Sequence, residues 1–224
     1  MQLDGMDGPT HRRAFLGGVA VGALSLAAPA FGAQQLLAEE TPPESADAWL
    51  GLIKGQHKQY FDAVSVNDGF AFAYAMNYID TMTSTYKIPD AQVTPVVGLR
   101  HFSIPLAFND DVWRKYKLGE MVKVNDPATK APSLRNPYFH PKAGELMFPG
   151  MAIEKMTARG AIITCCNVAL TLLSAHAAEA AGLPKDKAKA DWVAGLLPGV
   201  HVVPSGVLAV GRAQEKGCSY CFAG

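Results

Sequence analysis

The chain is predicted to fold as an α/β protein, a single domain in three layers with a mainly parallel sheet between helices. Three observations predict this class. Short apolar runs alternate with longer segments whose apolar residues recur at helical spacing. Turn-forming residues separate these segments. Once an N-terminal leader is set aside, about 190 residues remain, enough for one domain with a sizeable core.

The N-terminus is typical of an export signal. The apolar run 14–28 is shorter than the ~20 residues that span a bilayer. Arg12 and Arg13 precede it, and Phe15 and Leu16 follow at the spacing of the twin-arginine pattern. The sequence Ala-Pro-Ala at 28–30 is a candidate cleavage site. An ordinary secretory leader with a chance pair of arginines is the alternative.

These features predict a twin-arginine signal peptide over 1–30, a flexible tether over 31–48 and a folded domain over 49–224. The mature protein is then expected in the periplasm or otherwise exported. Past the leader, polar residues interrupt every apolar run, so we expect no membrane segment in the mature form.

The first strand and helix are predicted between residues 46 and 86. A short helix begins at Ala46 and leads into a strand over 58–64, which turn residues at 65–69 end. Apolar residues then recur at helical spacing and predict a helix over 70–86. They are Phe72, Met76, Ile79 and Met82.

The next strand is predicted over 91–100, where Pro95 favours an edge position or a bulge. A helix is expected around 105–117. Residues 123–150 contain five prolines, so we expect a long ordered loop or lid there.

Regular structure returns after residue 150 with a helix over 150–159. Asn167 is the expected N-cap of a helix that Gly182 ends. The remaining expected elements are a strand over 161–166, helices over 168–181, 185–194 and 204–216, and strands over 200–203 and 218–222.

Charge and motifs narrow the function classes. Lys plus Arg and Asp plus Glu each number 20, so the chain has no basic field for nucleic acid. Small molecules or proteins are the expected partners. Dinucleotide, P-loop, nucleophile-elbow and zinc-protease patterns do not occur in the expected context, and we predict no cofactor.

The four cysteines are the main candidates for chemistry, and they are Cys165, Cys166, Cys218 and Cys221. A thiol between a strand and a helix N-terminus is favoured as thiolate. Strand alternation turns Cys165 and Cys166 to opposite faces, so we expect one reactive and one buried thiol. A disulfide within either pair needs a turn or strain, whereas a bridge between the pairs is allowed if their strands are neighbours. Structural disulfides and a four-sulfur metal site are the alternatives.

Three more residues are predicted at the ligand-binding ends of the strands, Arg100, His101 and Asn167. Arg100 could hold an anionic ligand and His101 could transfer protons. The alternative for Arg100 and His101 is that they are partly exposed strand-end groups satisfied by nearby backbone.

The tail GVHVVPSGVLAVGRAQEKGCSY (199–220) resembles the end of the DsrE/DsrF-like family, and AIITCCN (161–167) is similar to the family's element around a cysteine. Together with weaker similarity upstream, the resemblance covers most of residues 57–222, with 123–150 as an insertion. It implies a compact α/β sandwich that forms oligomers, here a homo-oligomer. Some members relay sulfur as a cysteine persulfide, and Cys165 or Cys166 would carry that role.

The resemblance and the helix N-terminus together predict a protein that handles sulfur or thiols. Cys165 or Cys166 would be the acceptor and Cys218 or Cys221 the resolving partner. Its partners would be small sulfur species or a thiol-bearing protein. A non-catalytic ligand-binding or assembly module, stapled by disulfides, is the rival hypothesis, and a metal protein is a third.

Overall fold

The structure is a computed structural model that describes residues 46–224. The leader and nearly all of the tether predicted from the sequence lie outside the described residues. In the described part, no helix is both long and apolar enough to cross a membrane.

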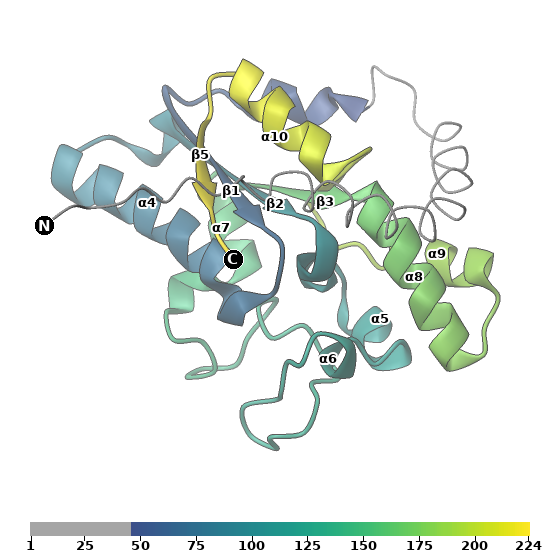
Figure 1. Cartoon of the computed structure of the whole chain (residues 1–224). Helices are drawn as coiled ribbons and strands as arrows, with labels where there is room; N and C mark the ends of the chain where they lie inside the picture. Colours follow the sequence, from purple (N-terminus) through teal and green to yellow (C-terminus); the bar gives the residue numbers. More distant parts are fainter. Residues whose placement is uncertain (1–45) are drawn as a thin grey trace, which may run out of the picture. The chain divides into compact units, whose positions relative to one another are not determined.

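The centre of the domain is one five-stranded sheet in which every pairing is parallel, with the order β4-β3-β2-β1-β5 (Figure 1). This confirms the predicted α/β class. The middle strands are buried along their whole length, as expected for a parallel sheet covered on both faces. The strands are β1 (His57–Ala63), β2 (Val93–Leu99), β3 (Ile162–Cys166), β4 (Val200–Val203) and β5 (Ser219–Phe222).

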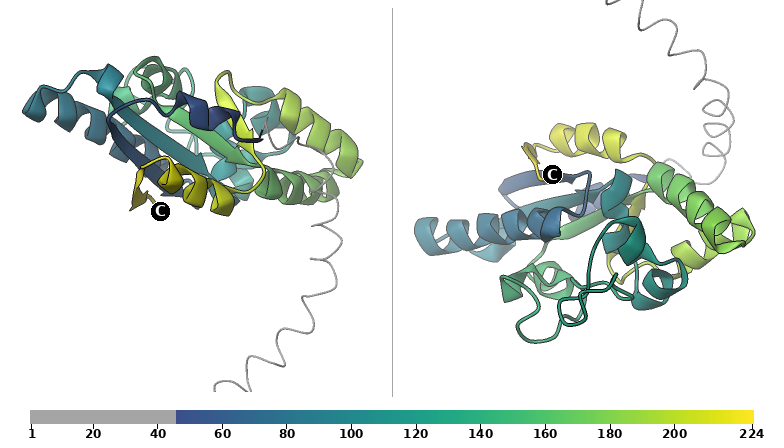
Figure 2. Two further views of the ribbon diagram at one scale, coloured as in Figure 1. Left: turned by 90° about the horizontal axis from the view of Figure 1, so that it is seen from above. Right: turned by 60° about the horizontal axis from the view of Figure 1, so that its bottom comes forward.

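Helices cover both faces of the sheet and complete the three layers (Figure 2). The α-helices are α4 (Phe70–Tyr86), α5 (Asp110–Lys115), α6 (Leu118–Met121), α7 (Ile153–Ala158), α8 (Asn167–Ala181), α9 (Lys185–Ala194) and α10 (Gly206–Glu215). The 3₁₀-helices are η1 (Ala48–Leu52), η2 (Asn67–Gly69), η3 (Asp90–Gln92), η4 (His101–Ala107) and η5 (Pro149–Met151).

The two faces of the sheet carry cores of different size. We call the side covered by α10 and η1 the α10 face, where Tyr60, Val96 and Ile162 pack with residues of those two helices. We call the other side the α4 face, where α4, η4, α8 and the long loop enclose the larger core. Because strand residues alternate, Phe61 and Val97 on the same strands belong to the α4 face.

The predicted position of β2 was wrong. Pro95 favoured an edge strand or a bulge, but β2 is the middle strand of the sheet. Pairing of β2 with β3 begins only at Val96, so Pro95 is paired with Gln59 of β1 alone. A proline is tolerated there because the strand has no second neighbour at that residue.

The helix predicted around 105–117 is divided into two parts. The segment begins as η4, and Phe108 and Asn109 are extended before α5 starts at Asp110. The Asn109 side chain caps α5 by accepting a hydrogen bond from the Val112 N–H at 3.1 Å. The cap supplies a new helix start that the apolar spacing alone did not reveal.

The proline-rich segment is an ordered loop, as predicted, with no strand or α-helix between 123 and 148. Its anchor is Asn136, which is fully buried and donates to the backbone oxygens of Leu106 and Phe108 at 2.9 and 3.0 Å. Tyr138 of the loop packs against Phe72 of α4. The loop therefore forms part of the core on the α4 face.

Candidate functional site

Polar side chains gather at the carboxyl ends of the strands on the α10 face. One row of residues in register crosses the sheet there, Asp62, Gly98, Thr164 and His201 on β1 to β4. Ligands of open parallel sheets bind beyond these strand ends, where loops lead into helix N-termini. The same end of the sheet holds the starts of α8, which follows β3, and α10, which follows β4.

A buried carboxylate and an arginine form the centre of this site. Arg100 Nε and Nη2 donate to the two oxygens of Asp62 at 2.7 and 2.9 Å, a bidentate pair. The Asp62 side chain is 2% exposed and that of Arg100 is 27% exposed. Hydrogen bonding to Asp62 raises the pKa of Arg100 above its ordinary value, so the guanidinium stays charged. The alternative that nearby backbone satisfies this guanidinium is therefore wrong.

Tyr220 of the edge strand β5 adds a third member to the pair. Its hydroxyl donates to Asp62 Oδ2 at 2.9 Å. Burial, followed by the hydrogen bond to Asp62, raises the pKa of Tyr220. The carboxylate is thus held by donors from β2's end and from β5, and Arg100 is fixed in orientation.

Two buried hydroxyls lie beneath this group without partners. Neither Tyr60 Oη nor Thr164 Oγ1 has a hydrogen-bond partner among the described residues, although both side chains are almost fully buried. The phenol lies over Gly98, where an added Cβ would come 1.8 Å from its oxygen. Burial raises the pKa of Tyr60, and the Thr164 hydroxyl lies close enough to act against this shift, although the two hydroxyls do not have the geometry of a hydrogen bond. The phenol therefore stays neutral and points into the polar end of this face.

Cys166 lies at the N-terminus of α8. Its backbone is extended, with φ −70° and ψ 115°, and its Sγ accepts a hydrogen bond from the Ala169 N–H at 3.4 Å. Cys166, and not the predicted Asn167, is therefore the N-cap of the helix. Asn167 is instead the first helical residue and is buried.

The adjacent thiol is buried more deeply and lies on the other side of the strand. Cys165 is fully buried in the core of the α4 face, and burial raises its pKa. Cys166 follows Ile162 and Thr164 at the spacing of the α10 face, beside Arg100. The expectation that only one thiol of the pair is buried was wrong. Cys165 is 0% and Cys166 6% exposed, and both pack with the larger core.

Gly206 brings α10 into contact with both Cys166 and Arg100. A Cβ at this first helical residue would lie 2.6 Å from Arg100 Cβ and 3.2 Å from Cys166 Cβ. The arginine and the cysteine therefore border the same point at the start of α10. Ser205, the N-cap of α10, accepts from the Leu208 N–H at 3.5 Å.

The structure does not bring the two cysteine pairs together. Strands β3 and β5 are separated by β2 and β1, which places them about 14 Å apart at the ~4.8 Å spacing of neighbouring strands. The condition for a bridge between the pairs is not met, since a disulfide needs Cα atoms within about 7 Å. The four-sulfur metal site and the resolving role of Cys218 or Cys221 within one chain fail for the same reason.

Cys218 and Cys221 are also apart from each other. Cys218 packs in the core under α10, whereas Cys221 packs against the core of the α4 face. Burial raises the pKa of both thiols. All four cysteines are free, and no cluster of three or more His, Cys, Asp or Glu side chains suited to a metal ion occurs within residues 46–224.

His101 stands outside this group. It begins η4 with a left-handed φ of 56°, its side chain is exposed, and its ring packs edge-on against Phe102 at 4.6 Å between centroids. Of the sequence-predicted residues, the structure brings together Arg100, Cys166 and Asn167 at the strand ends, and leaves His101, Cys165, Cys218 and Cys221 elsewhere.

Sequence reasoning missed Asp62, Tyr60, Thr164 and Tyr220. A signal for Asp62 was present, because one carboxylate inside the apolar run YFDAV (60–64) must be paired if that strand is buried. The partner could not be named, since Arg100 lies 38 residues away and meets Asp62 only once β1 and β2 are paired.

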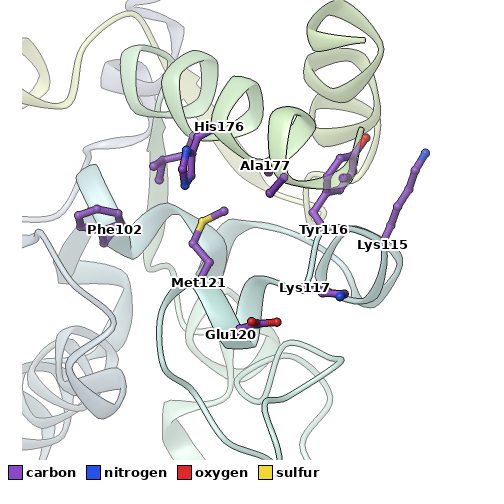
Figure 3. Close-up of a pocket in the computed structure, with 11 residues that line it drawn as sticks. Phe102, Lys115, Tyr116, Lys117, Glu120, Met121, His176 and Ala177 are labelled. Atoms are coloured by element: carbon purple, nitrogen blue, oxygen red, sulfur yellow. The ribbon is translucent and has the colours of Figure 1, made fainter. Parts of the chain in front are cut away.

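A large cavity occupies a different part of the molecule, between α8 and the α5–α6 segment (Figure 3). Its volume is about 930 Å³, within the range typical of small-molecule sites. Met121 points toward α8, and Lys115 turns away to Asp191 at 2.5 Å. None of the predicted site residues lines it. Its lining includes Phe102, Lys117, Glu120, Met121, Leu173, His176 and Ala177.

Comparison with known proteins leaves the chain without a match. No family profile, curated protein or solved structure is similar to it above the level of chance.

Proposed function

We propose that this protein accepts and passes on sulfur through the thiol of Cys166. The observation that carries the proposal is the position of this thiol. It caps α8 at the strand end where ligands of parallel sheets bind, beside a fixed arginine. The resemblance of the tail to the DsrE/DsrF-like family points to the same chemistry, and the proposal includes membership of that family. It also includes export by the twin-arginine pathway and assembly as a homo-oligomer.

The reaction requires no oxidant. The Cys166 thiolate attacks the terminal sulfur of a persulfide, R–S–SH, and a new S–S bond forms as the old one breaks. The leaving thiolate R–S⁻ takes up the proton that the Cys166 thiol released, and Cys166 then carries the persulfide. A thiolate of a second protein attacks the outer sulfur in the same way and regenerates Cys166. The Ala169 N–H, which donates to Cys166 Sγ, holds the sulfur at the start of α8.

The test is sulfur loading of the reduced protein by cysteine persulfide, followed by intact-mass measurement and peptide mapping. We expect one added sulfur on Cys166, and its loss in Cys166→Ser. Cys165→Ser is the matched control, because Cys165 is enclosed in the core of the α4 face and should not affect loading. Retention of the added sulfur in Cys166→Ser would overturn the proposal.

The cavity beside α8 favours a second candidate function, the binding of a small molecule without catalysis. Its lining combines Met121, Leu173 and Phe102 with the polar groups of His176 and Lys117, a mixture usual for ligand sites. Ala180→Trp places a large ring on the cavity wall. A ligand found by thermal-shift screening should lose its effect in this variant and keep it in Cys166→Ser.

A further inference from the structure

The feature that carries a further inference is the open side of the Arg100 guanidinium. Its Nε and one Nη2 hydrogen are engaged by Asp62, and no other hydrogen bond of this guanidinium is found within residues 46–224. A guanidinium has five N–H donors, so its remaining N–H groups can bind a further acceptor. The Arg100 side chain is 27% exposed, so these donors can be reached from solvent.

The charge of Asp62 does not cancel this attraction at the surface. Its carboxylate is almost fully buried and is covered by Arg100 and by the hydroxyl of Tyr220. An approaching anion therefore meets the guanidinium before the carboxylate. Because Asp62 holds the guanidinium in a bidentate geometry, the open donors keep a fixed direction and lose little conformational entropy on binding.

The surroundings of Arg100 also favour an anion. The N-termini of α8 and α10 meet at this place, around Gly206, and the partial positive charges of both helices point there. Independent of the helices, two unpartnered hydroxyls lie beneath the site. Thr164 Oγ1 and Tyr60 Oη are more than nine-tenths buried, and Tyr60 Oη lies over Gly98, which pairs with Asp62 and Thr164 in the sheet. A buried hydroxyl without a partner is costly, and a bound acceptor would satisfy it.

We propose that the compound reacting at Cys166 carries an anionic group, and that Arg100 binds this group while the thiol attacks. The inference rests on the proposed function and adds a substrate class to it, small anionic thiols and persulfides. A Cβ at Gly206 would lie 2.6 Å from Arg100 Cβ and 3.2 Å from Cys166 Cβ, so the two side chains start side by side and a small compound can reach both the guanidinium and the sulfur. Asp62 and Tyr220 act as positioning residues for Arg100.

The test uses two alkylating reagents with the same leaving group, iodoacetate, which is anionic, and iodoacetamide, which is neutral. The rate ratio of iodoacetate to iodoacetamide at Cys166 is measured by peptide mapping in the folded chain. The same ratio in the urea-unfolded chain is the reference, since it removes the intrinsic difference between the reagents. We expect the folded ratio to exceed the reference by about tenfold. This is the size of the effect that one charge-assisted hydrogen bond contributes to binding.

Arg100→Gln should return the ratio to the reference. Because that change leaves Asp62 buried and unpaired, the double variant Asp62→Asn with Arg100→Gln provides a neutral pair in case the single variant unfolds. Arg114→Gln is the matched control, as this arginine is exposed and, among residues 46–224, its ion pair is with Asp111 one turn away. It should leave the ratio unchanged.

Three results would overturn the inference: a folded ratio equal to the reference, a raised ratio that persists in both Arg100 variants, or no reaction of Cys166 with either reagent. The first two are separable from failure of the proposed function, because sulfur loading of Cys166 by a persulfide would still be observed. Loss of loading together with a raised, Arg100-dependent ratio would instead retain the anion site and remove the sulfur role.

Discussion

The two faces of the sheet differ in what the strands place on them. On the α4 face the strands contribute Phe61, Val97, Leu99, Ile163 and Cys165, which are apolar and closely enclosed. On the α10 face the same strands contribute hydroxyls, a carboxylate and a thiol toward their carboxyl ends. Because side chains alternate along a strand, the same strands supply apolar core residues to one face and polar groups to the other. The α4 face provides most of the core, and the α10 face holds the polar groups of the candidate site.

The adjacent cysteines show the same division over one peptide bond. Cys165 is a core side chain whose thiol is held neutral by burial, and Cys166 caps a helix beside a charged arginine. Residue type alone did not distinguish them. The face toward which each side chain points decides its role.

The largest expected effect comes from removing a side chain on the α4 face. Leu99→Ala should lower the free energy of unfolding by about 3 kcal/mol, because the methyl groups are lost and a cavity remains in a closed core. Urea unfolding measures the change. Leu208→Ala, at an exposed position on α10, is the control and should cost less than about 0.5 kcal/mol. Equal losses in the two variants would contradict the assignment of the main core to the α4 face.

Two tyrosine variants test whether the buried hydroxyls of the α10 face contribute to stability. Tyr60→Phe removes a buried hydroxyl without a partner, so stability should stay unchanged or rise by up to about 1 kcal/mol. Tyr220→Phe removes a hydroxyl bonded to Asp62 and should cost about 1 kcal/mol. Thermal and urea unfolding compare the two. A clear loss in Tyr60→Phe would mean that its hydroxyl has a partner, such as an enclosed water.

The smallest expected effect concerns His201 on β4. Burial lowers its pKa in the folded state, whereas in the unfolded chain histidine titrates near about 6.5. The unfolded state therefore binds the proton more readily, and the stability present above about pH 6.5 declines as the pH falls through the folded pKa. In urea unfolding at pH 7.5 and 5.5, His201→Gln should show a smaller difference than the natural chain. An identical difference would assign the pH dependence to other groups.

The local elements were largely predictable from the sequence. Helices over 70–86 and 185–194 and the strand over 200–203 have the predicted bounds. The first has a clear apolar pattern, whereas the polar helix 185–194 is bounded by Pro184 and Gly195. Errors arose where one residue competes with the pattern. Pro95 indicated an edge strand, but β2 is central. The proline is tolerated because β3 pairs with β2 only from Val96 onward. Asn167 is the better N-cap by type, yet the strand runs directly into the helix and leaves that position to Cys166.

The candidate site was less predictable, because it depends on strand order. Arg100 and Cys166 could be placed at strand ends from their local context. Their neighbours Asp62 and Tyr220 could not, since β1 lies between β2 and β5 only in the folded sheet. The same order separates the cysteine pairs, which are close in neither sequence nor space.

The sulfur at the start of α8 occupies a position where an oxygen would be the stronger acceptor. Serine is among the preferred N-cap residues, and a thiol is a weak hydrogen-bond acceptor. A chain with serine at position 166 should therefore be at least as stable as the natural one, yet lack the proposed nucleophile. At this one atom, the change that favours stability removes the proposed reaction. The Cys166→Ser variant is therefore suited to capturing a bound substrate that it cannot convert.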